Sequence, residues 1–148
     1  MGIGAFNIRV YGIAIKDGLL LISTEMGGDH AFTKFPGGGL EPGEGLSDCL
    51  KREWKEEMNA DIAVNDLFYV NEFYQPSAFN PAQQIISFYY HVSLLSDDLH
   101  FKSIEKRWNK EYLVEFRWEP LNELQIEDFT FPIDRLVFTR LREVYLNK

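Results

Sequence analysis

The most constraining feature of this chain is a glycine-rich segment that runs directly into an apolar stripe of helical spacing. Residues 35–45, FPGGGLEPGEG, hold five glycines and two prolines. These residues break both helical and strand patterns, so we expect no regular structure there. Asn59 is a suitable place for a following helix to end, because asparagine tolerates the left-handed conformation. Between these limits every fourth residue is apolar, which predicts an amphipathic helix that carries Leu46, Leu50, Trp54 and Met58.

The rest of the chain contains neither a repeat nor a linker, which favours one domain over residues 1–148. We expect the residues after Pro132 to form a closing amphipathic helix, and the turn residues 16–18, KDG, to join two strands as a hairpin. Surface loops are expected at residues 25–34 and 76–83. We therefore expect an α+β fold or an α/β sandwich in which helices cover a mixed sheet. Its strands are predicted at residues 6–15, 19–24, 66–75, 84–95 and 112–121.

Composition narrows the range of partners. The formal net charge of -8 disfavours binding to long nucleic acids or to anionic membranes, whose phosphates attract basic surfaces. No segment has the length of a transmembrane helix. The single cysteine, Cys49, cannot form an intrachain disulfide, which favours a cytoplasmic location. Its position on the predicted helix favours a packing role.

Three carboxylates share one side of the predicted helix. At about 100° per residue, Glu53, Glu56 and Glu57 fall within roughly a third of its circumference, where like charges repel. A solvated helix face is one explanation, since surface Glu-Glu pairs are common. A divalent cation is the other, because carboxylate oxygens suit Mg²⁺ or Mn²⁺. The glycine-rich segment before the helix favours the metal site, and Arg52 is placed to orient a carboxylate.

The same residues resemble a known motif. Gly38, Glu44, Arg52-Glu53 and Glu56-Glu57 stand at the spacing of the Nudix box, and FPGGGLEPGE is similar to its usual lead-in. The box covers residues 38–60. It departs from the family pattern at its end, where Asn59 replaces a glycine and Ala60 fills the apolar position. The chain is therefore identified as similar to the Nudix (MutT-like) hydrolases.

This resemblance implies a Nudix α/β/α sandwich with a mixed β-sheet. It also implies hydrolysis of a nucleoside diphosphate linked to another group, with Mg²⁺ or Mn²⁺ as cofactor. A small-molecule nucleotide or other diphosphate is then the substrate, and oxidised nucleoside triphosphates, nucleotide sugars, dinucleoside polyphosphates and capped ends all remain open. A homodimer is permitted by the aromatic content.

The resemblance also implies roles for individual residues. Arg52 would hold an acid in place and Glu44 would support the site, so that the catalytic set is Glu44, Arg52, Glu53, Glu56 and Glu57. Metal ligands would be a carbonyl of the Gly37–Gly38 turn and the carboxylates Glu53, Glu56 and Glu57. The residue that takes the proton from water lies outside the box in many family members. Its candidates here are Glu105, Glu111, Asp97, Asp98 and Glu53 itself.

Substrate contacts outside the box are predicted more loosely. Lys34 is placed to meet a phosphate, and its neighbour Phe35 also flanks the box. The aromatic and amide-rich segment 72–84 offers rings that can stack on a nucleobase. These rings can equally belong to the core or to a dimer contact. They are Phe73, Tyr74 and Phe79.

Two other functions remain compatible with the residues. A Nudix-fold module can sense a nucleotide without cleaving it, although every box acid is present here. An isomerase on the same fold would use acid-base chemistry on an isoprenoid diphosphate. Product analysis separates all three functions.

Overall fold

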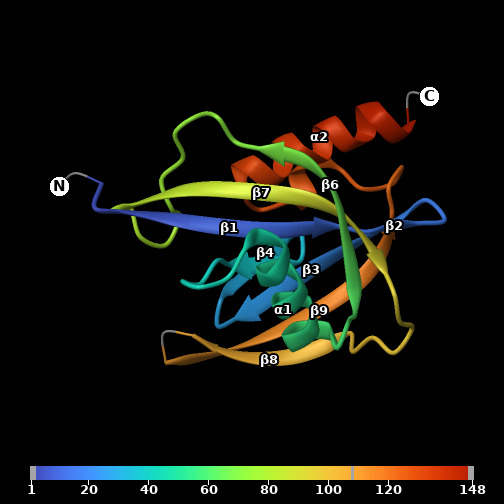
Figure 1. The fold of residues 1–148 in the computed structure, drawn as a ribbon, viewed down its shortest axis with the longest axis horizontal. Coiled ribbons are helices and arrows are strands. Elements are labelled where there is room, and N and C mark those ends of the chain that lie inside the picture. The colour runs from blue at the N-terminus through green and yellow to red at the C-terminus, as the bar shows by residue number, and fades with distance from the viewer. Residues whose placement is uncertain (1–2, 108, 147–148) are drawn as a thin grey trace.

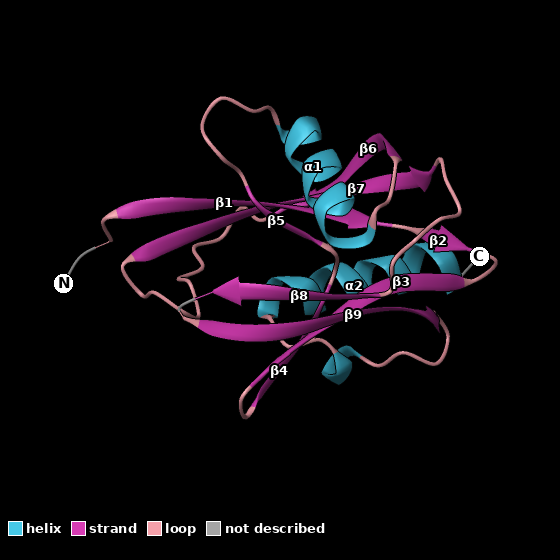
Figure 2. Cartoon of the chain, turned by 90° about the horizontal axis from the view of Figure 1, so that it is seen from below, coloured by secondary structure: helices cyan, strands magenta, loops and turns pink. Residues whose placement is uncertain are grey.

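Two β-sheets form the framework of the protein (Figure 1). The computed structural model describes residues 3–107 and 109–146. The first sheet has the order β5 (Gly37–Gly39), β1 (Ala5–Ile13), β7 (Gln83–Leu94) and β6 (Ile62–Val70). The second has the order β2 (Ile15–Lys16), β3 (Leu19–Gly27), β9 (Lys110–Pro120) and β8 (Lys102–Arg107), with β4 (His30–Lys34) paired to β3. Figure 2 shows them as two separate groups of strands.

Strand pairing makes the first sheet mixed. β1 and β7 run parallel, with Arg9 opposite Ser87 and Tyr11 opposite Tyr89. The other pairings between described strands are antiparallel. A parallel pair requires a long crossover connection, and here that connection contains β2 to β5, α1 and β6.

Two helices pack on opposite sides of these strands. The helix α1 spans Leu46–Met58 and ends at Asn59, whose φ of 57° is left-handed, as the sequence predicts. The helix α2 spans Pro132–Leu146, and a short 3₁₀ turn, Ile126–Asp128, precedes it. Among the described residues, no helix is both long enough and apolar enough to cross a membrane.

Alternation along the strands divides the core in two, since successive side chains point to opposite faces. Val10 and Leu21 pack with the apolar residues of α1, whereas Tyr11 and Leu20 pack with those of α2. Each helix therefore covers its own face of the strands. The predicted α/β/α sandwich with a mixed sheet is confirmed.

Several local predictions need correction. The turn at residues 16–18 joins only the two residues of β2 to β3, so β1 and β3 are not partners and lie in different sheets. The strand predicted at residues 66–75 is β6, which lies earlier, at Ile62–Val70. The sequence reasoning missed β8, Lys102–Arg107, whose partner is β9. For β1 the pairing with the distant strand β7 decides the outcome, whereas β8 and β6 pair with the strands that follow them, β9 and β7.

The two predicted loops on either side of Phe35 also contain strands. Residues 25–34 are not a surface loop, because β3 continues to Gly27 and β4 begins at His30. Within the glycine-rich segment, Gly37–Gly39 form the short strand β5 on the edge of β1. Glycine is disfavoured in strands by its conformational entropy, so the tertiary pairing overrides the local propensity.

Contact between Trp54 and Gly12 sets how closely α1 approaches the sheet. Trp54 is fully buried and donates a hydrogen bond from Nε1 to the Pro36 carbonyl, 3.1 Å away. The backbone N–H of Gly12 donates to the same carbonyl at 2.8 Å. A Cβ at Gly12 would lie 2.6 Å from the Trp54 ring, so only glycine fits beneath it.

We therefore expect Gly12→Ala to destabilise the fold by roughly 1–3 kcal/mol, the usual cost of overpacking a core. Urea unfolding of the variant measures this loss. Gly4→Ala is the matched control, since its nearest neighbour to an added Cβ is 3.9 Å away. Equal stability of the two variants would contradict this account of the helix packing.

A buried acid anchors the start of α2. Asp134 is 2 % exposed and accepts a hydrogen bond from the Tyr89 hydroxyl at 2.5 Å. Burial raises the pKa of Asp134 to about 6, although the Tyr89 hydrogen bond opposes the rise. The folded state therefore binds the proton more tightly than the unfolded state. Asp134 contributes its full stability below its ordinary pKa and loses it as the pH rises to about 6.

For Asp134→Asn we expect a pH-dependent gain relative to the wild type. The variant cannot ionise, so its unfolding free energy minus that of the wild type should rise by roughly 3 kcal/mol between pH 4 and pH 7. Urea unfolding at a series of pH values measures this difference, in which the other titrating groups cancel. A difference that does not change with pH would show that Asp134 is not buried as described.

Candidate active site

The three glutamates of α1 differ in their surroundings. The Glu56 side chain is 60 % exposed, whereas the Glu53 side chain is 16 % exposed and Glu57 is buried. A solvated helix face would expose all three. Two of the carboxylates instead point toward the junction of the helix with the sheets, where their charge needs a partner.

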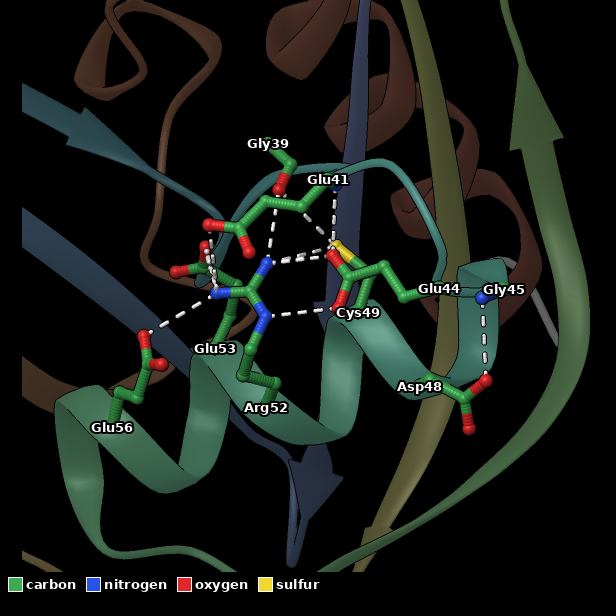
Figure 3. Close-up of polar contacts among 9 residues, drawn as sticks. All are labelled: Gly39, Glu41, Glu44, Gly45, Asp48, Cys49, Arg52, Glu53 and Glu56. Carbon is green, nitrogen blue, oxygen red and sulfur yellow. Dashed lines mark hydrogen bonds and ion pairs between the residues drawn. The ribbon is translucent and has the colours of Figure 1, made fainter.

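Arg52 is the centre of the carboxylate cluster (Figure 3). Its Nη2 and Nε donate to the two carboxylate oxygens of Glu44 at 2.7 and 2.9 Å, a bidentate pair. Its Nη1 donates to Glu53 at 3.0 Å and to Glu56 at 3.3 Å. One guanidinium therefore fixes three acids, with Glu41 a further 4.0 Å contact. The sequence predicts that Arg52 holds Glu53 or another acid, and the structure adds Glu44 and Glu56 as its partners. The catalytic roles of these residues stay a prediction.

Arg52 also ties the cluster to β5. Its Nη2 donates to the Gly39 carbonyl at 3.1 Å, and the Cys49 thiol donates to the same carbonyl at 3.4 Å. Burial raises the pKa of Cys49 to about 12, so the sulfur is a protonated packing atom. The glycine strand is thereby held directly over the first half of α1.

Close approach explains the glycine at position 38. A Cβ on Gly38 would lie 2.4 Å from the carboxyl carbon of Glu53. The Glu53 carboxylate therefore rests against the bare backbone of β5. This contact brings together two predicted metal ligands, the backbone of Gly38 and the carboxylate of Glu53.

The carboxylates of the cluster differ in pKa. Hydrogen bonds from Arg52 lower the pKa of Glu44 to about 2. Burial raises the pKa of Glu53, and Arg52 opposes that rise. Burial also raises the pKa of Glu57 well above its usual range, and the neighbouring Glu105 adds to the effect. Buried carboxylates that repel one another gain most from a nearby cation.

Of the acids predicted outside the box, Glu105 on β8 is the one that reaches Glu57. Glu111 lies opposite Lys106 near the end of the β8–β9 hairpin. Asp98 accepts the Asn59 side-chain amide through its backbone carbonyl, at 3.1 Å. Asp97 lines a separate groove beside Trp118.

Lys34 is a buried lysine, not a loop residue. Its Nζ lies 3.6 Å from the Glu25 carboxylate and donates to the Gly37 carbonyl at 3.4 Å. Burial lowers the pKa of Lys34, but the charges of Glu25 and Glu57 outweigh it, so the net pKa is raised. The ammonium group thus stands between the carboxylate cluster and a cavity. The sequence reasoning missed Glu25, because it assigned both residues to a loop.

That cavity has a volume of about 310 Å³ and lies over the β1–β7 pair on the α2 side. Its walls include Arg9, Glu25, Lys34 and Asp134, together with an aromatic edge that includes Phe79. The alternating polar residues of β1 are the signal that sequence analysis could have used. They are Asn7, Arg9 and Tyr11.

The aromatic residues predicted to contact the substrate lie in three different kinds of position. Phe79 lines the cavity and is half exposed. Phe73 and Tyr74 are exposed outside it. Phe35 is fully buried and stacks on Phe129 with centroids 5.0 Å apart, so its ring has no surface for a ligand and its expected substrate contact needs correction.

The donor set fits a hard divalent cation. Among the described residues, no group of three or more His, Cys, Asp or Glu side chains is arranged to hold a metal ion by itself. Mg²⁺ is usually held through one or two carboxylates, with substrate phosphates and water completing its shell. Glu53 and Glu57 are the residues that would hold it, beside the backbone of Gly38.

The helix α1 therefore presents carboxylates that one arginine holds beside a ligand-sized cavity. The chain belongs to the Nudix family, since the NUDIX domain profile matches residues 6–140.

Solved structures with this fold include the E. coli ORF135 protein, with a TM-score of 0.68 and 18 % identity. That alignment covers 97 % of this chain and 96 % of the other. A MutT Nudix hydrolase from Burkholderia pseudomallei gives a TM-score of 0.66 at 16 % identity, covering 92 % of this chain and 98 % of that one.

Among curated proteins, the mRNA-decapping protein OPG122 of variola virus is 34 % identical over 68 residues. The match covers 44 % of this chain and 27 % of the viral protein. The chain therefore aligns with about a quarter of the length of this relative.

Replacing Gly38 with alanine should displace the Glu53 carboxylate from its position against β5. We expect the affinity for Mn²⁺, measured by electron paramagnetic resonance, to fall at least tenfold while circular dichroism shows a folded protein. Gly4→Ala, whose added Cβ would lie 3.9 Å from its nearest neighbour, serves again as the control. Unchanged Mn²⁺ affinity in Gly38→Ala would remove Glu53 from the metal site.

Proposed function

We propose that the chain hydrolyses a pyrophosphate bond in a nucleoside diphosphate linked to another group, with Mg²⁺ or Mn²⁺ as the cofactor. The observation that carries this proposal is the carboxylate cluster of α1, which Arg52 orders beside the cavity. The substrate's pyrophosphate would lie against Glu53 and Glu57, with the attached group in the cavity. Residues 1–148 would act as one Nudix hydrolase domain.

Each residue of the cluster has a distinct task in this mechanism. Glu53 and Glu57 would hold the metal, and the more exposed Glu56 is the third ligand that the sequence predicts. When bound, the metal would supply charge neutralisation at the attacked phosphorus and activation of water. Arg52 is a positioning residue, because its guanidinium sets the carboxylates and β5 relative to one another. Glu44 holds Arg52 through the bidentate pair.

The proton of the attacking water needs an acceptor near the cluster. Glu105 is supported by its position beside Glu57. Glu53 is the alternative within the box. The buried Lys34 supplies a positive charge next to these acids and limits their mutual repulsion.

A second candidate substrate is a capped RNA end. The similarity to the decapping protein of variola virus favours it, although that similarity covers less than half of this chain. The net charge of -8 disfavours extended contact with RNA, so the cap structure itself would carry most of the recognition. A cap dinucleotide therefore belongs among the substrates tested.

The state of Cys49 bears on the cellular location. Cys49 is buried and unpaired, which is compatible with a reducing cytoplasm. We propose no contact with membranes or long nucleic acids. A homodimer stays a prediction that size-exclusion chromatography with light scattering tests.

Purified protein with Mg²⁺ should release a nucleoside monophosphate from at least one nucleoside triphosphate, nucleotide sugar, dinucleoside polyphosphate or cap dinucleotide. Glu57→Gln should lower kcat at least 100-fold because it removes a metal-binding carboxylate. Chromatography of the products and phosphorus NMR measure both results.

Glu143→Gln, an exposed carboxylate of α2, is the matched control and should keep full activity. Thermal unfolding confirms that each variant is folded. Full turnover by Glu57→Gln would contradict the metal-site assignment. Tight binding of a nucleotide without turnover would instead favour a sensing module, and a rearranged diphosphate product would favour an isomerase.

A further inference from the structure

The cavity beside the carboxylate cluster has a polar floor made by β1 and β7. Asn7, Arg9 and Tyr11 alternate along β1 and therefore share one face. Ser87 and Tyr89 occupy the opposite positions on the parallel strand β7. The metal-site proposal uses none of these five side chains.

Arg9 is the group on this floor with unused hydrogen-bonding capacity. Its Nε donates to the Tyr11 hydroxyl at 3.0 Å, which is the one hydrogen bond that its guanidinium makes to the described residues. An arginine carries five N–H donors in a planar fork. The Nη1 and Nη2 donors are therefore available to an occupant of the cavity, whose wall Arg9 forms.

The position of Arg9 lies at the boundary between the cavity and the carboxylate cluster. Arg9 is opposite Gly39 in the β1–β5 pairing, and a Cβ on Gly39 would lie 3.2 Å from Nη1. Tyr11 raises the pKa of Arg9, and Glu53 is close enough to add to this rise. A group attached to a phosphate at the cluster would enter the cavity past this guanidinium.

Charges on the other walls argue against an anionic occupant. Glu25 and Asp134 are buried carboxyl groups that line the same cavity. Lys34 pairs with Glu25, so the interior carries cations and acids in balance. A neutral group with both donors and acceptors on its edge matches these walls better than a phosphate does.

The shape of the cavity fits a flat ring as its occupant. Phe79 and Phe131 form one side of the cavity, with ring centroids 5.9 Å apart at an angle of 69°, and Phe32 packs behind them. A volume of about 310 Å³ is at the small end for ligand sites, which suits one ring system. The apolar side and the polar floor together fit a heteroaromatic base.

We propose that Arg9 is a specificity-determining residue that selects a 6-oxopurine, guanine or hypoxanthine, by donating to its O6 and N7 acceptors. An arginine fork matches these two adjacent acceptors, whereas adenine places its N6 donors against the guanidinium. A donor facing a donor leaves both unpaired in a buried site, which produces discrimination. This inference rests on the proposed function, because it assumes that the occupant is the nucleoside of a substrate.

Binding in the absence of metal tests this inference separately from catalysis. In EDTA, calorimetry with GDP, IDP and ADP measures base preference even if no nucleotide is ever hydrolysed. We expect the wild type to bind GDP and IDP at least tenfold more tightly than ADP. Arg9→Lys keeps the charge but loses the fork, so it should weaken GDP and IDP at least fivefold and ADP less than twofold.

Arg140→Lys is the matched control, since Arg140 lies outside the cavity over the Tyr69 ring, and it should keep the wild-type preference. Circular dichroism shows whether Arg9→Lys is folded. Equal weakening of all three nucleotides would overturn the inference and place Arg9 on a phosphate. Wild-type binding that does not distinguish GDP from ADP, or no binding of GDP, would overturn it as well.

A turnover measurement then separates this inference from the proposed function. If the protein cleaves nucleotides, Arg9→Lys should raise KM for GTP at least fivefold with kcat little changed, and leave KM for ATP within twofold. A fall in kcat that is equal for both substrates would contradict a role in base selection. Absence of any cleavage would count against the proposed function and leave the calorimetric result standing.

Discussion

The arrangement of the site depends on one partly buried arginine, Arg52, and on the acids around it. Arg52 reaches Glu44 through two hydrogen bonds and Glu53 through a third, while it also holds the Gly39 carbonyl of β5. A helix, a loop and a strand therefore meet at one guanidinium. Charge-assisted bonds of this kind are short and directional, so they fix geometry as well as contribute energy. The requirement for glycine at position 38 follows, because Glu53 lies against that backbone.

The sequence predicted those elements whose signal is local. The helix α1 and its end at Asn59 follow from an apolar period and from one residue that accepts a left-handed backbone. The strands β4, β5 and β8 escaped prediction because each is short, and β5 also depends on the distant strand β1 for its pairing. β4 and β8 instead form hairpins with the neighbouring strands β3 and β9. The prediction of a hairpin between β1 and β3 was wrong because β1 pairs with β7 as a parallel strand.

The candidate site likewise has one part that the local sequence predicts and one part that it does not. The box acids and Arg52 lie within one helix and its lead-in, so spacing alone brings them together. The cavity combines Arg9 of β1, Glu25 of β3 and Asp134 of α2, and no local pattern places such distant residues side by side. The residues proposed to act at the phosphates therefore come from one contiguous motif, whereas those proposed to recognise the attached group are brought together by the tertiary fold. Lys34 and Arg9 lie where the two parts join.

The central claim is that the α1 carboxylates bind a divalent cation beside the glycine strand. An anomalous difference map from a crystal soaked with Mn²⁺ and a non-hydrolysable nucleotide tests it most directly. The account predicts metal peaks within coordination distance of Glu53 and Glu57, next to the nucleotide's phosphates, with the Arg52–Glu44 pair intact. Bound nucleotide with its phosphates away from α1, or metal peaks at another cluster of acids, would contradict it.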